Sequence, residues 1–369
     1  MRNFKKFAAV MAATALALSA CSGKDAGGDK GSEGAKSDFK ACLVSDAGGW
    51  DDRSFNESAY NGLMQSKDAL GINVQTAESS SDADFAPNVE AMVSDGCKMI
   101  IGVGYLLEQP LQDAANNNPD LQFGLVDSYF TDGDAPVKVD NARPLVFNTA
   151  EAAYLAGYLA AGMSKSGTVA TFGGLQIPSV TIFMDGFVDG VAKYNADKGA
   201  SVKVLGWDKA SQAGAFTNSF DDQTLGKQQA QQFIDQGADV IMPVAGPVGL
   251  GAAAAAQEAG DVMFIGVDSD WFETAPDYAD LILTSVVKEI AASVEDTVKA
   301  GADGTFSADP YVGTLENGGV SIAPFHNFED KVPAELKDAV KKLEEQIKSG
   351  ELKVESPASP LYCHRKAES

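Results

Sequence analysis

The sequence predicts an α/β protein with two doubly wound, Rossmann-like lobes. Apolar strand-like runs, glycine-rich turns and amphipathic helical patterns alternate from Phe39 to Leu283, which is typical of parallel α/β architecture. The alternation begins afresh near Glu151, so two sheets are favoured over one very long sheet. The chain of 369 residues is long enough for two domains, each with its own core.

Each expected strand is a short apolar run bounded by turn residues. The runs that meet this description are Lys40–Ser45, Ile72–Ala77, Met99–Gly104, Gln122–Asp127, Val137–Val139, Leu145–Phe147, Thr168–Phe172, Ser201–Gly206, Val240–Val244, Met263–Asp268 and Ile282–Val286. Beyond Asp303 the pattern thins to a strand-like run at Gly319–Pro324 and a charged helix from Pro333 to about Lys348.

The helix after Gly173-Gly174 carries the clearest apolar stripe in the chain. Its apolar residues between positions 180 and 191 keep the spacing of a core-facing helix, so Phe183 and Phe187 are expected in the core and not in a site. Pro178 suits the first turn of this helix, where its missing N–H is not needed.

Two further helices have readable starts. Ser54 and Glu57 fit a capping box, in which the hydroxyl and the carboxylate satisfy free backbone donors, so a helix should begin near Phe55. Asn148 to Glu151 should cap the helix that contains Tyr154-Leu155-Ala156-Gly157, close to the point where the second set of strands begins.

The first residues read as a secretory signal. Residues 2–6 hold three basic side chains, and Phe7–Leu18 is apolar but shorter than the roughly 20 residues that a membrane-spanning helix needs. Leu18-Ser19-Ala20-Cys21 resembles a bacterial lipobox, which predicts lipidation of Cys21 and an extracytoplasmic, membrane-anchored protein. The alternative is a plain cleaved signal with Cys21 as an ordinary cysteine. Residues 21–38 are rich in Gly, Ser, Lys and Asp and read as a flexible linker.

The charge balance is strongly acidic. Residues 1–20 hold three of the 28 Lys and Arg residues and none of the 52 Asp and Glu residues, so their removal changes the formal charge from −24 to −27. A nucleic-acid partner is therefore not expected, and polyanionic ligands are disfavoured.

Three cysteines follow Cys21. Cys42 and Cys97 each open an apolar run, so they could lie at the same ends of neighbouring strands and form a disulfide, with Cys363 left over. Three free thiols are the alternative. The chain has no CxxC motif and only two histidines, so we expect no metal site.

Three aspartates stand at the ends of expected strands: Asp46, Asp127 and Asp268. A single aspartate in such a position is usually a turn or cap residue. Ligands of doubly wound sheets bind beyond the carboxyl ends of the strands, so three such carboxylates could converge on one ligand in a cleft between the lobes. Phenylalanines accompany them at Ser54-Phe55-Asn56 and Asn218-Ser219-Phe220.

These motifs resemble those of the basic membrane protein (BMP) family of bacterial lipoproteins, which bind nucleosides and feed ABC importers. The resemblance covers roughly Phe39 to Val298. Its motifs are Asp46-Ala47-Gly48-Gly49, Asp52, Ser54-Phe55-Asn56, Gly62-Leu63, Glu151-Ala152-Ala153-Tyr154-Leu155-Ala156-Gly157, Gly173-Gly174 with Ile177-Pro178, Gly186-Phe187 with Gly190, Ser219-Phe220-Asp221, Gly237-Ala238-Asp239-Val240-Ile241, Gly266-Val267-Asp268 and Thr284-Ser285-Val286 with Lys288. It implies a type I periplasmic-binding-protein fold, a purine nucleoside as ligand, ABC permease subunits as partners, no cofactor and a monomer.

The resemblance also implies roles for single residues. Phe55 and Phe220 would sandwich the purine, and Asn56 and Asp127 would address its edge. An ionised Asp127 accepts hydrogen bonds, which matches the N1–H of guanosine and inosine and favours them over adenosine. At the sugar, the positions implied are Asp268, Lys288 and Gly246, with Asp46 as a further lining residue. Pro247 stands where the family usually has a second glycine.

Other functions remain open at this point. Carboxylates in a cleft also serve nucleoside hydrolases, although no further catalytic motif is present. Two-lobed proteins of similar architecture bind sugars and other solutes, and a purely structural surface lipoprotein is a third alternative.

The expected organisation assigns every segment to a lobe or a connection. Residues 1–20 are the signal, 21–38 the linker, 39–148 with about 284–308 the first lobe, 149–283 the second lobe, and 309–369 a crossover, helix and tail. Hinges are expected at Phe147–Ala150, Leu283–Ser285 and Asp303–Tyr311, about which the lobes would close on the ligand.

Overall fold

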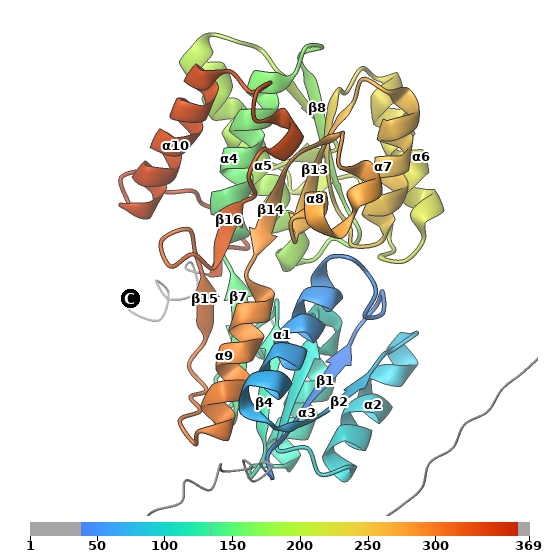
Figure 1. Ribbon diagram of the computed structural model, residues 1–369, viewed down its shortest axis with the longest axis vertical. Coiled ribbons are helices and arrows are strands. Elements are labelled where there is room, and N and C mark those ends of the chain that lie inside the picture. Colours follow the sequence, from blue (N-terminus) through green and yellow to red (C-terminus); the bar gives the residue numbers. More distant parts are fainter. Residues whose placement is uncertain (1–37, 134, 361–369) are drawn as a thin grey trace, which may run out of the picture. The chain divides into compact units, whose positions relative to one another are not determined.

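Two six-stranded sheets form the framework of the computed structural model, which describes residues 38–133 and 135–360 (Figure 1). The expected α/β architecture with two doubly wound lobes is confirmed. The predicted signal peptide, the lipidated Cys21, nearly all of the linker, and the tail with Cys363 lie outside the described residues.

The first lobe is built on a wholly parallel sheet with strand order β15-β7-β4-β3-β1-β2. Its strands are β1 (Lys40–Ser45), β2 (Asn73–Ala77), β3 (Met99–Val103), β4 (Gln122–Val126), β7 (Ala142–Phe147) and β15 (Tyr311–Gly313). Its helices are α1 (Phe55–Leu70), α2 (Asp82–Ser94), the short η1 (Tyr105–Leu107), α3 (Glu108–Asn117) and α9 (Ile290–Ala302). Helices α1 and α9 lie side by side on one face of this sheet (Figure 1).

The second lobe has strand order β16-β14-β13-β12-β8-β9, and only β16 runs antiparallel to its neighbour. Its strands are β8 (Thr168–Gly173), β9 (Lys203–Leu205), β12 (Val240–Val244), β13 (Met263–Asp268), β14 (Ile282–Lys288) and β16 (Val320–Ile322). Its helices are α4 (Thr149–Met163), α5 (Pro178–Lys198), α6 (Gln223–Asp235), α7 (Val248–Ala259), α8 (Trp271–Thr274), η2 (Pro276–Tyr278), η3 (His326–Phe328) and α10 (Ala334–Lys348).

Helices α4 and α5 pack closely against each other over the second sheet. Most of α4 is buried, and the apolar stripe of α5 is buried as expected, with Phe183 and Phe187 almost completely inaccessible. A Cβ atom at Gly190 would lie 2.0 Å from the carbonyl oxygen of Tyr154. Only glycine therefore permits this approach of the two helices.

The chain crosses between the lobes three times. The first crossing, at Asn148 between β7 and α4, falls inside the expected hinge Phe147–Ala150. The expected hinge at Leu283–Ser285 and the boundary near 284 are wrong, because β14 continues through Lys288 in the second sheet and the chain crosses at Glu289. The expected hinge at Asp303–Tyr311 is also wrong, because β15 first joins the first sheet and the chain crosses at residues 314–319.

Several element predictions differ from the structure. The expected strand Val137–Val139 is irregular, and a hairpin of β5 (Thr131–Asp132) and β6 (Ala135–Pro136) precedes it instead. A second hairpin, β10 (Trp207–Asp208) with β11 (Ala213–Gly214), was not expected. The other expected strands are present with ends that shift by a few residues, because hydrogen-bond partners and not local composition set where pairing stops.

Cys42 and Cys97 form a disulfide, with their Cα atoms 6.0 Å apart. Cys42 lies in β1, and Cys97 lies two residues before the neighbouring strand β3. The parallel arrangement therefore brings together two residues that are 55 positions apart in sequence. The alternative of free thiols at these two positions is wrong.

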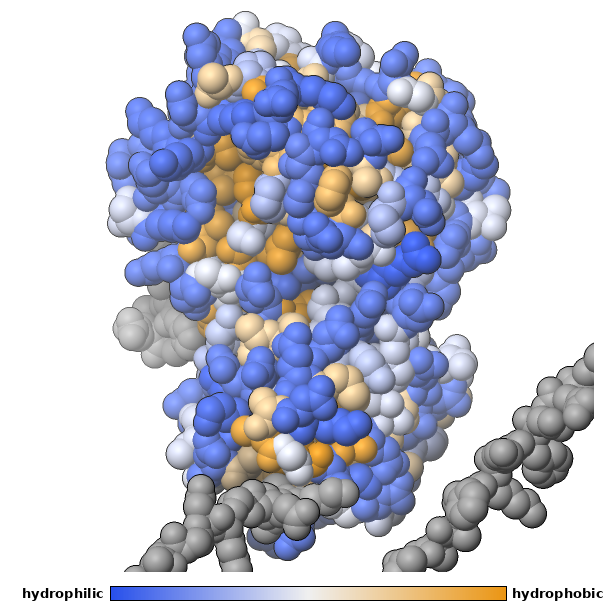
Figure 2. Space-filling view, in the orientation of Figure 1, coloured by the Kyte–Doolittle hydropathy of each residue, from blue (hydrophilic) through white to orange (hydrophobic). Residues whose placement is uncertain are grey.

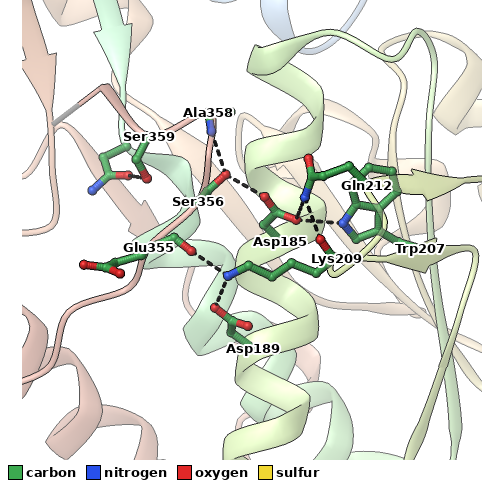
Figure 3. A network of polar contacts seen from close by, with 10 residues as sticks. Asp185, Asp189, Trp207, Lys209, Gln212, Glu355, Ser356, Ala358 and Ser359 are labelled. Carbon is green, nitrogen blue, oxygen red and sulfur yellow. Dashed lines mark hydrogen bonds and ion pairs between the residues drawn. The ribbon is translucent and has the colours of Figure 1, made fainter. Parts of the chain in front are cut away.

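The segment after α10 returns across the second lobe to the first crossing (Figure 3). The hydroxyl of Ser356 donates to Asp185 Oδ2 at 2.6 Å, and Asp185 Oδ1 accepts from Trp207 Nε1 at 2.8 Å. The hydroxyl of Ser359 donates to Asn148 Oδ1 at 3.1 Å. Because Asp185 is fully buried, the donors on Ser356 and Trp207 satisfy a carboxylate that would otherwise destabilise the fold.

Most of the face seen in Figure 2 is hydrophilic, with smaller apolar patches. This agrees with the excess of acidic residues in the chain. Across residues 38–133 and 135–360, every helix is too short or too polar to cross a bilayer.

Candidate functional site

A cavity of about 530 Å³, counted with its open mouth, lies at the carboxyl ends of strands from both sheets. Residues from both lobes line it, as expected for a ligand site in doubly wound sheets. Every residue that the sequence assigned to ligand binding lies on its wall: Asp46, Phe55, Asn56, Asp127, Phe220, Gly246, Asp268 and Lys288.

Lys288 joins the two lobes at the centre of the site. Its Nζ lies 2.5 Å from Asp127 Oδ2, which follows β4 of the first lobe, and 2.8 Å from Asp268 Oδ1, which ends β13 of the second. The side chain of Lys288 is only 3% exposed, and those of the two aspartates are 9% exposed. Two carboxylates and one ammonium group therefore share a nearly dry space.

The charges in this trio stabilise each other against burial. Burial alone lowers the pKa of Lys288, but the two carboxylates raise it, and the net pKa lies above the ordinary lysine value. Burial raises the pKa of Asp127, and Lys288 partly opposes that rise. At neutral pH the lysine is therefore charged and holds both side chains in place.

The two aspartates share an unusual backbone conformation. Asp127 has φ 67° and Asp268 has φ 71°, in the left-handed region that aspartate tolerates better than most residues. In each lobe the strand ends with this turn, and both carboxylates meet the same lysine. The sequence signal, an aspartate directly after an apolar strand, thus marked equivalent positions in the two lobes.

Aromatic rings provide the apolar part of the wall. Phe55 is the first residue of α1 in the first lobe, and Phe220 precedes α6 in the second. Lys288 Nζ lies 4.6 Å from the centroid of the Phe55 ring, a cation–π contact. A Cβ atom at Gly174 would lie 2.4 Å from the Phe220 ring, so this glycine makes room for it. Phe183 is in the core as expected, yet it also lines the cavity.

The N-terminus of α1 is capped by a different residue from the one that the sequence predicts. Asp52 Oδ1 accepts from the backbone N–H of Ser54 at 2.9 Å and of Glu57 at 3.0 Å, and Asp52 Oδ2 accepts from that of Asn56 at 2.8 Å. The hydroxyl of Ser54 makes no capping bond, so the predicted capping box is wrong. Burial raises the pKa of Asp52 to about 6, although these backbone donors lower it. At Asn148, the second predicted cap, the side chain also makes no capping bond.

Two polar side chains beside this loop face the cavity. Asn56 Nδ2 donates to the carbonyl of Ala47 at 2.7 Å, which leaves Asn56 Oδ1 buried with no hydrogen-bond partner among the described residues. Asp46 is buried, and burial raises its pKa well above the ordinary aspartate value. A Cβ atom at Gly104 would lie 1.8 Å from Asp46 Oδ2, so this carboxylate rests directly on the glycine.

The cavity wall also contains residues that the sequence prediction missed. Asp52 belongs to the opening motif and could have been assigned, whereas Tyr105 and Ser179 carry no local signal. Trp50 packs against Tyr60 with ring centroids 5.9 Å apart and does not line the cavity. In the part of the chain that the structure describes, no group of His, Cys, Asp and Glu side chains could hold a metal ion.

Residues 39–357 match the family model Bmp, described as ABC transporter substrate-binding protein PnrA-like. The chain belongs to the Bmp family. The ABC transporter nucleoside-binding protein BmpA of Lactococcus lactis subsp. cremoris is 32% identical over 367 residues, which cover 94% of this chain and 97% of that protein. Basic membrane protein A of Borreliella burgdorferi is 32% identical over 275 residues, which cover 74% of this chain and 73% of that protein.

Solved structures share the fold of this Bmp protein. An ABC transporter solute-binding protein from Aeropyrum pernix has a TM-score of 0.77 at 24% identity, covering 89% of this chain and 96% of that one. One from Conexibacter woesei has a TM-score of 0.66 at 23% identity, covering 86% and 99%. The expected type I periplasmic-binding fold is confirmed. The Bmp protein is a substrate-binding protein of an ABC transporter and not an enzyme; it binds a small ligand and works with permease components.

Proposed function

We propose that this Bmp protein binds purine nucleosides in the cavity between its lobes and delivers them to the permease. The observation that carries the proposal is the division of one cavity into an aromatic part, with Phe55 and Phe220, and a polar part around Lys288. A nucleoside has the same division, since its base is flat and its ribose carries hydroxyls. The name of the Lactococcus lactis relative, a nucleoside-binding protein, supports this ligand class.

The base would lie between the two phenylalanine rings, which stack on any heteroaromatic face. Asn56 Oδ1, buried without a partner among the described residues, would accept from a donor on the edge of the base. Gly246 has φ 52°, and only the Phe220 carbonyl oxygen, at 3.8 Å, lies near the place of its missing Cβ. The ligand could therefore approach this backbone closely. Asp268 and Lys288 would share the ribose hydroxyls as acceptor and donor.

Asp127 would favour guanosine and inosine. Lys288 donates to its Oδ2, so Oδ1 is the oxygen left for the N1–H that these nucleosides have and adenosine lacks. In Asp127→Asn, isothermal titration should show guanosine weakened by about ten- to hundredfold, as for a hydrogen bond to a charged group. Adenosine is the internal control, because any disturbance of Lys288 affects both ligands. Equal losses for the two nucleosides would contradict the preference.

The site should reject nucleotides. Asp46, Asp52, Asp127 and Asp268 all line the cavity, and its one lysine is already bound to two of them. A phosphate would add negative charge without a free cation to meet it. We expect guanosine to raise the melting temperature and guanosine monophosphate to leave it unchanged. A stronger shift with the nucleotide would count against the assignment.

We also propose that the protein is anchored through lipid on Cys21, outside the cytoplasmic membrane, as a monomer. The lipobox-like sequence supports the anchor, as does the name of a relative from Pyrococcus abyssi, an uncharacterized lipoprotein 29% identical over 358 residues. Mass spectrometry of the native protein should find a diacylglyceryl adduct at Cys21 that is lost in Cys21→Ser. An unmodified cysteine in the native protein would overturn the anchor.

Closure of the lobes about the three crossings would enclose the ligand. Small-angle scattering with and without guanosine should then show a smaller radius of gyration for the bound form. An unchanged radius of gyration, under conditions where titration shows binding, would contradict closure of the lobes on the ligand.

A further inference from the structure

We infer that Ser54 is a positioning residue that fastens the two lobes together beside the ligand cavity. It stands at the end of the loop before α1 in the first lobe, immediately before Phe55. Its hydroxyl lies 2.9 Å from the carbonyl oxygen of Val267 and 3.3 Å from Asp268 Oδ2, both in β13 of the second lobe. Ser54 is 1% exposed, so these contacts are shielded from water.

The Ser54 hydroxyl takes no part in capping the helix, because another residue supplies the cap. At α6 and α8 the N-cap residues Asp222 and Asp270 accept with their own side chains from the first turn. At α1 the N-cap residue is Ser54, but Asp52 supplies the acceptors for the first turn. The serine hydroxyl instead donates across the cleft, so the sequence pattern that resembled a capping box marks a contact between the lobes.

A second hydroxyl makes the reciprocal contact. Ser269, directly after β13 in the second lobe, donates through Oγ to the carbonyl oxygen of Arg53 in the first lobe at 3.1 Å. The pairs Ser54 with Val267 and Ser269 with Arg53 thus run in opposite directions between the same two segments. We call these two hydrogen bonds the serine clasp.

The serine clasp lies next to the groups that line the cavity. Asp268 is held by Lys288 on Oδ1 at 2.8 Å, and the Ser54 hydroxyl lies 3.3 Å from its Oδ2. The segments that carry the clasp also carry Phe55 and Asp268. Separation of the lobes at this point would break both hydrogen bonds and move the aromatic wall away from the carboxylate. Ligand contact and lobe closure are therefore mechanically linked through Ser54.

The clasp joins the two lobes in the arrangement that the structure describes, so its loss should favour separation of the lobes and speed ligand release. In Ser54→Ala, one neutral hydrogen bond between the lobes is lost, which should speed dissociation by about two- to tenfold and leave association nearly unchanged. Ser58→Ala is the matched control, because Ser58 Oγ donates at 2.6 Å to the Ser54 carbonyl within the same lobe. A purely local role in α1 would give the two variants the same release rate.

The first experiment is amide hydrogen exchange on the ligand-free full chain. The clasp predicts that Ser54→Ala speeds exchange at residues 267–269 in the opposite lobe, in addition to the first turn of α1, whereas Ser58→Ala affects α1 alone. Exchange in Ser54→Ala that changes only in α1 would overturn the inference. Ser269→Ala provides the same test from the other lobe if Ser54→Ala does not fold.

The second experiment measures guanosine dissociation by stopped-flow fluorescence, and it rests on the proposed function for its probe. Faster release from Ser54→Ala and Ser269→Ala, but not from Ser58→Ala, is the expected result. Release at the wild-type rate from both clasp variants would overturn the inference. Failure of the wild-type protein to bind guanosine would refute the nucleoside proposal instead, and hydrogen exchange would then decide on the clasp alone.

Discussion

Replacement of Lys288 by methionine provides the most demanding test of the site's electrostatics. Methionine keeps much of the length of the side chain but removes the charge. Lys288 lies 2.5 Å from Asp127 and 2.8 Å from Asp268, and all three side chains are nearly inaccessible. The substitution would leave two buried carboxylates without their cation. Breaking a buried ion pair in this way costs about 3–5 kcal/mol, a large part of a typical unfolding free energy of about 5–15 kcal/mol.

The assay is urea unfolding of the ligand-free protein, followed by circular dichroism. Lys299→Met is the control, because Lys299 pairs with Asp303 on the surface, where the side chains are 57% and 49% exposed. Water and salt screen such a pair, so this control should unfold like the wild type. A clear loss in Lys288→Met together with none in Lys299→Met is the expected result.

The deficit in the unfolding free energy of Lys288→Met should also change with pH in a defined direction. Lys288 opposes the rise that burial causes in the pKa of Asp127, so its removal raises that pKa further. The Asp127 carboxylate of the variant then takes up a proton more readily as the pH falls, and the variant's deficit in unfolding free energy shrinks. On the alkaline side, the wild type loses the contribution of Lys288 as the pH rises through the raised pKa of that lysine. A deficit below about 1 kcal/mol at neutral pH, within the range of surface pairs, or one that grows on acidification, would refute the reasoning.

Three further perturbations test other parts of the structure. Gly104→Ala should lower the melting temperature and abolish guanosine binding, because its Cβ would lie 1.8 Å from Asp46 Oδ2 and its φ is 113°; unchanged titration would refute this packing. Reduction of the Cys42–Cys97 disulfide should lower the unfolding free energy by about 2–4 kcal/mol, measured in urea with and without reductant; identical curves would mean that the bond contributes nothing. Ser356→Ala should cost about 1–3 kcal/mol in thermal unfolding, because it takes a donor from a buried carboxylate; a variant as stable as the wild type would show that the other donors suffice.

Local sequence patterns were sufficient to predict part of the site wall. Asp127 and Asp268 each follow an apolar run, and parallel strands of a doubly wound sheet present such residues at one edge. Phe55, Asn56 and Phe220 came from the family resemblance, since single phenylalanines carry no positional information of their own. All of them line the cavity, while their contacts with a ligand stay a prediction.

What could not be read from the sequence depends on long-range contacts. Asp52 caps α1, and the Ser54 hydroxyl contacts Val267 in the other lobe, a partner more than 200 positions away that the local pattern does not indicate. The crossing at Glu289 was misplaced because β14 is continuous through Lys288, and no turn residue marks the change of lobe before it. Strand β15 has only three residues, and it joins the first sheet through pairing with β7, which its composition does not indicate.

The contact between Ser359 and Asn148 has a practical consequence for anyone who builds a biosensor from this protein. The last described turn of the chain bonds to the residue at which the backbone first changes lobes. A fluorophore or an immobilising tag attached near Ser359 would disturb the crossing at Asn148 and would alter the lobe motion that it is meant to report. Labels at surface positions on α2 or α6, which are remote in sequence from every crossing, would leave the crossing at Asn148 undisturbed.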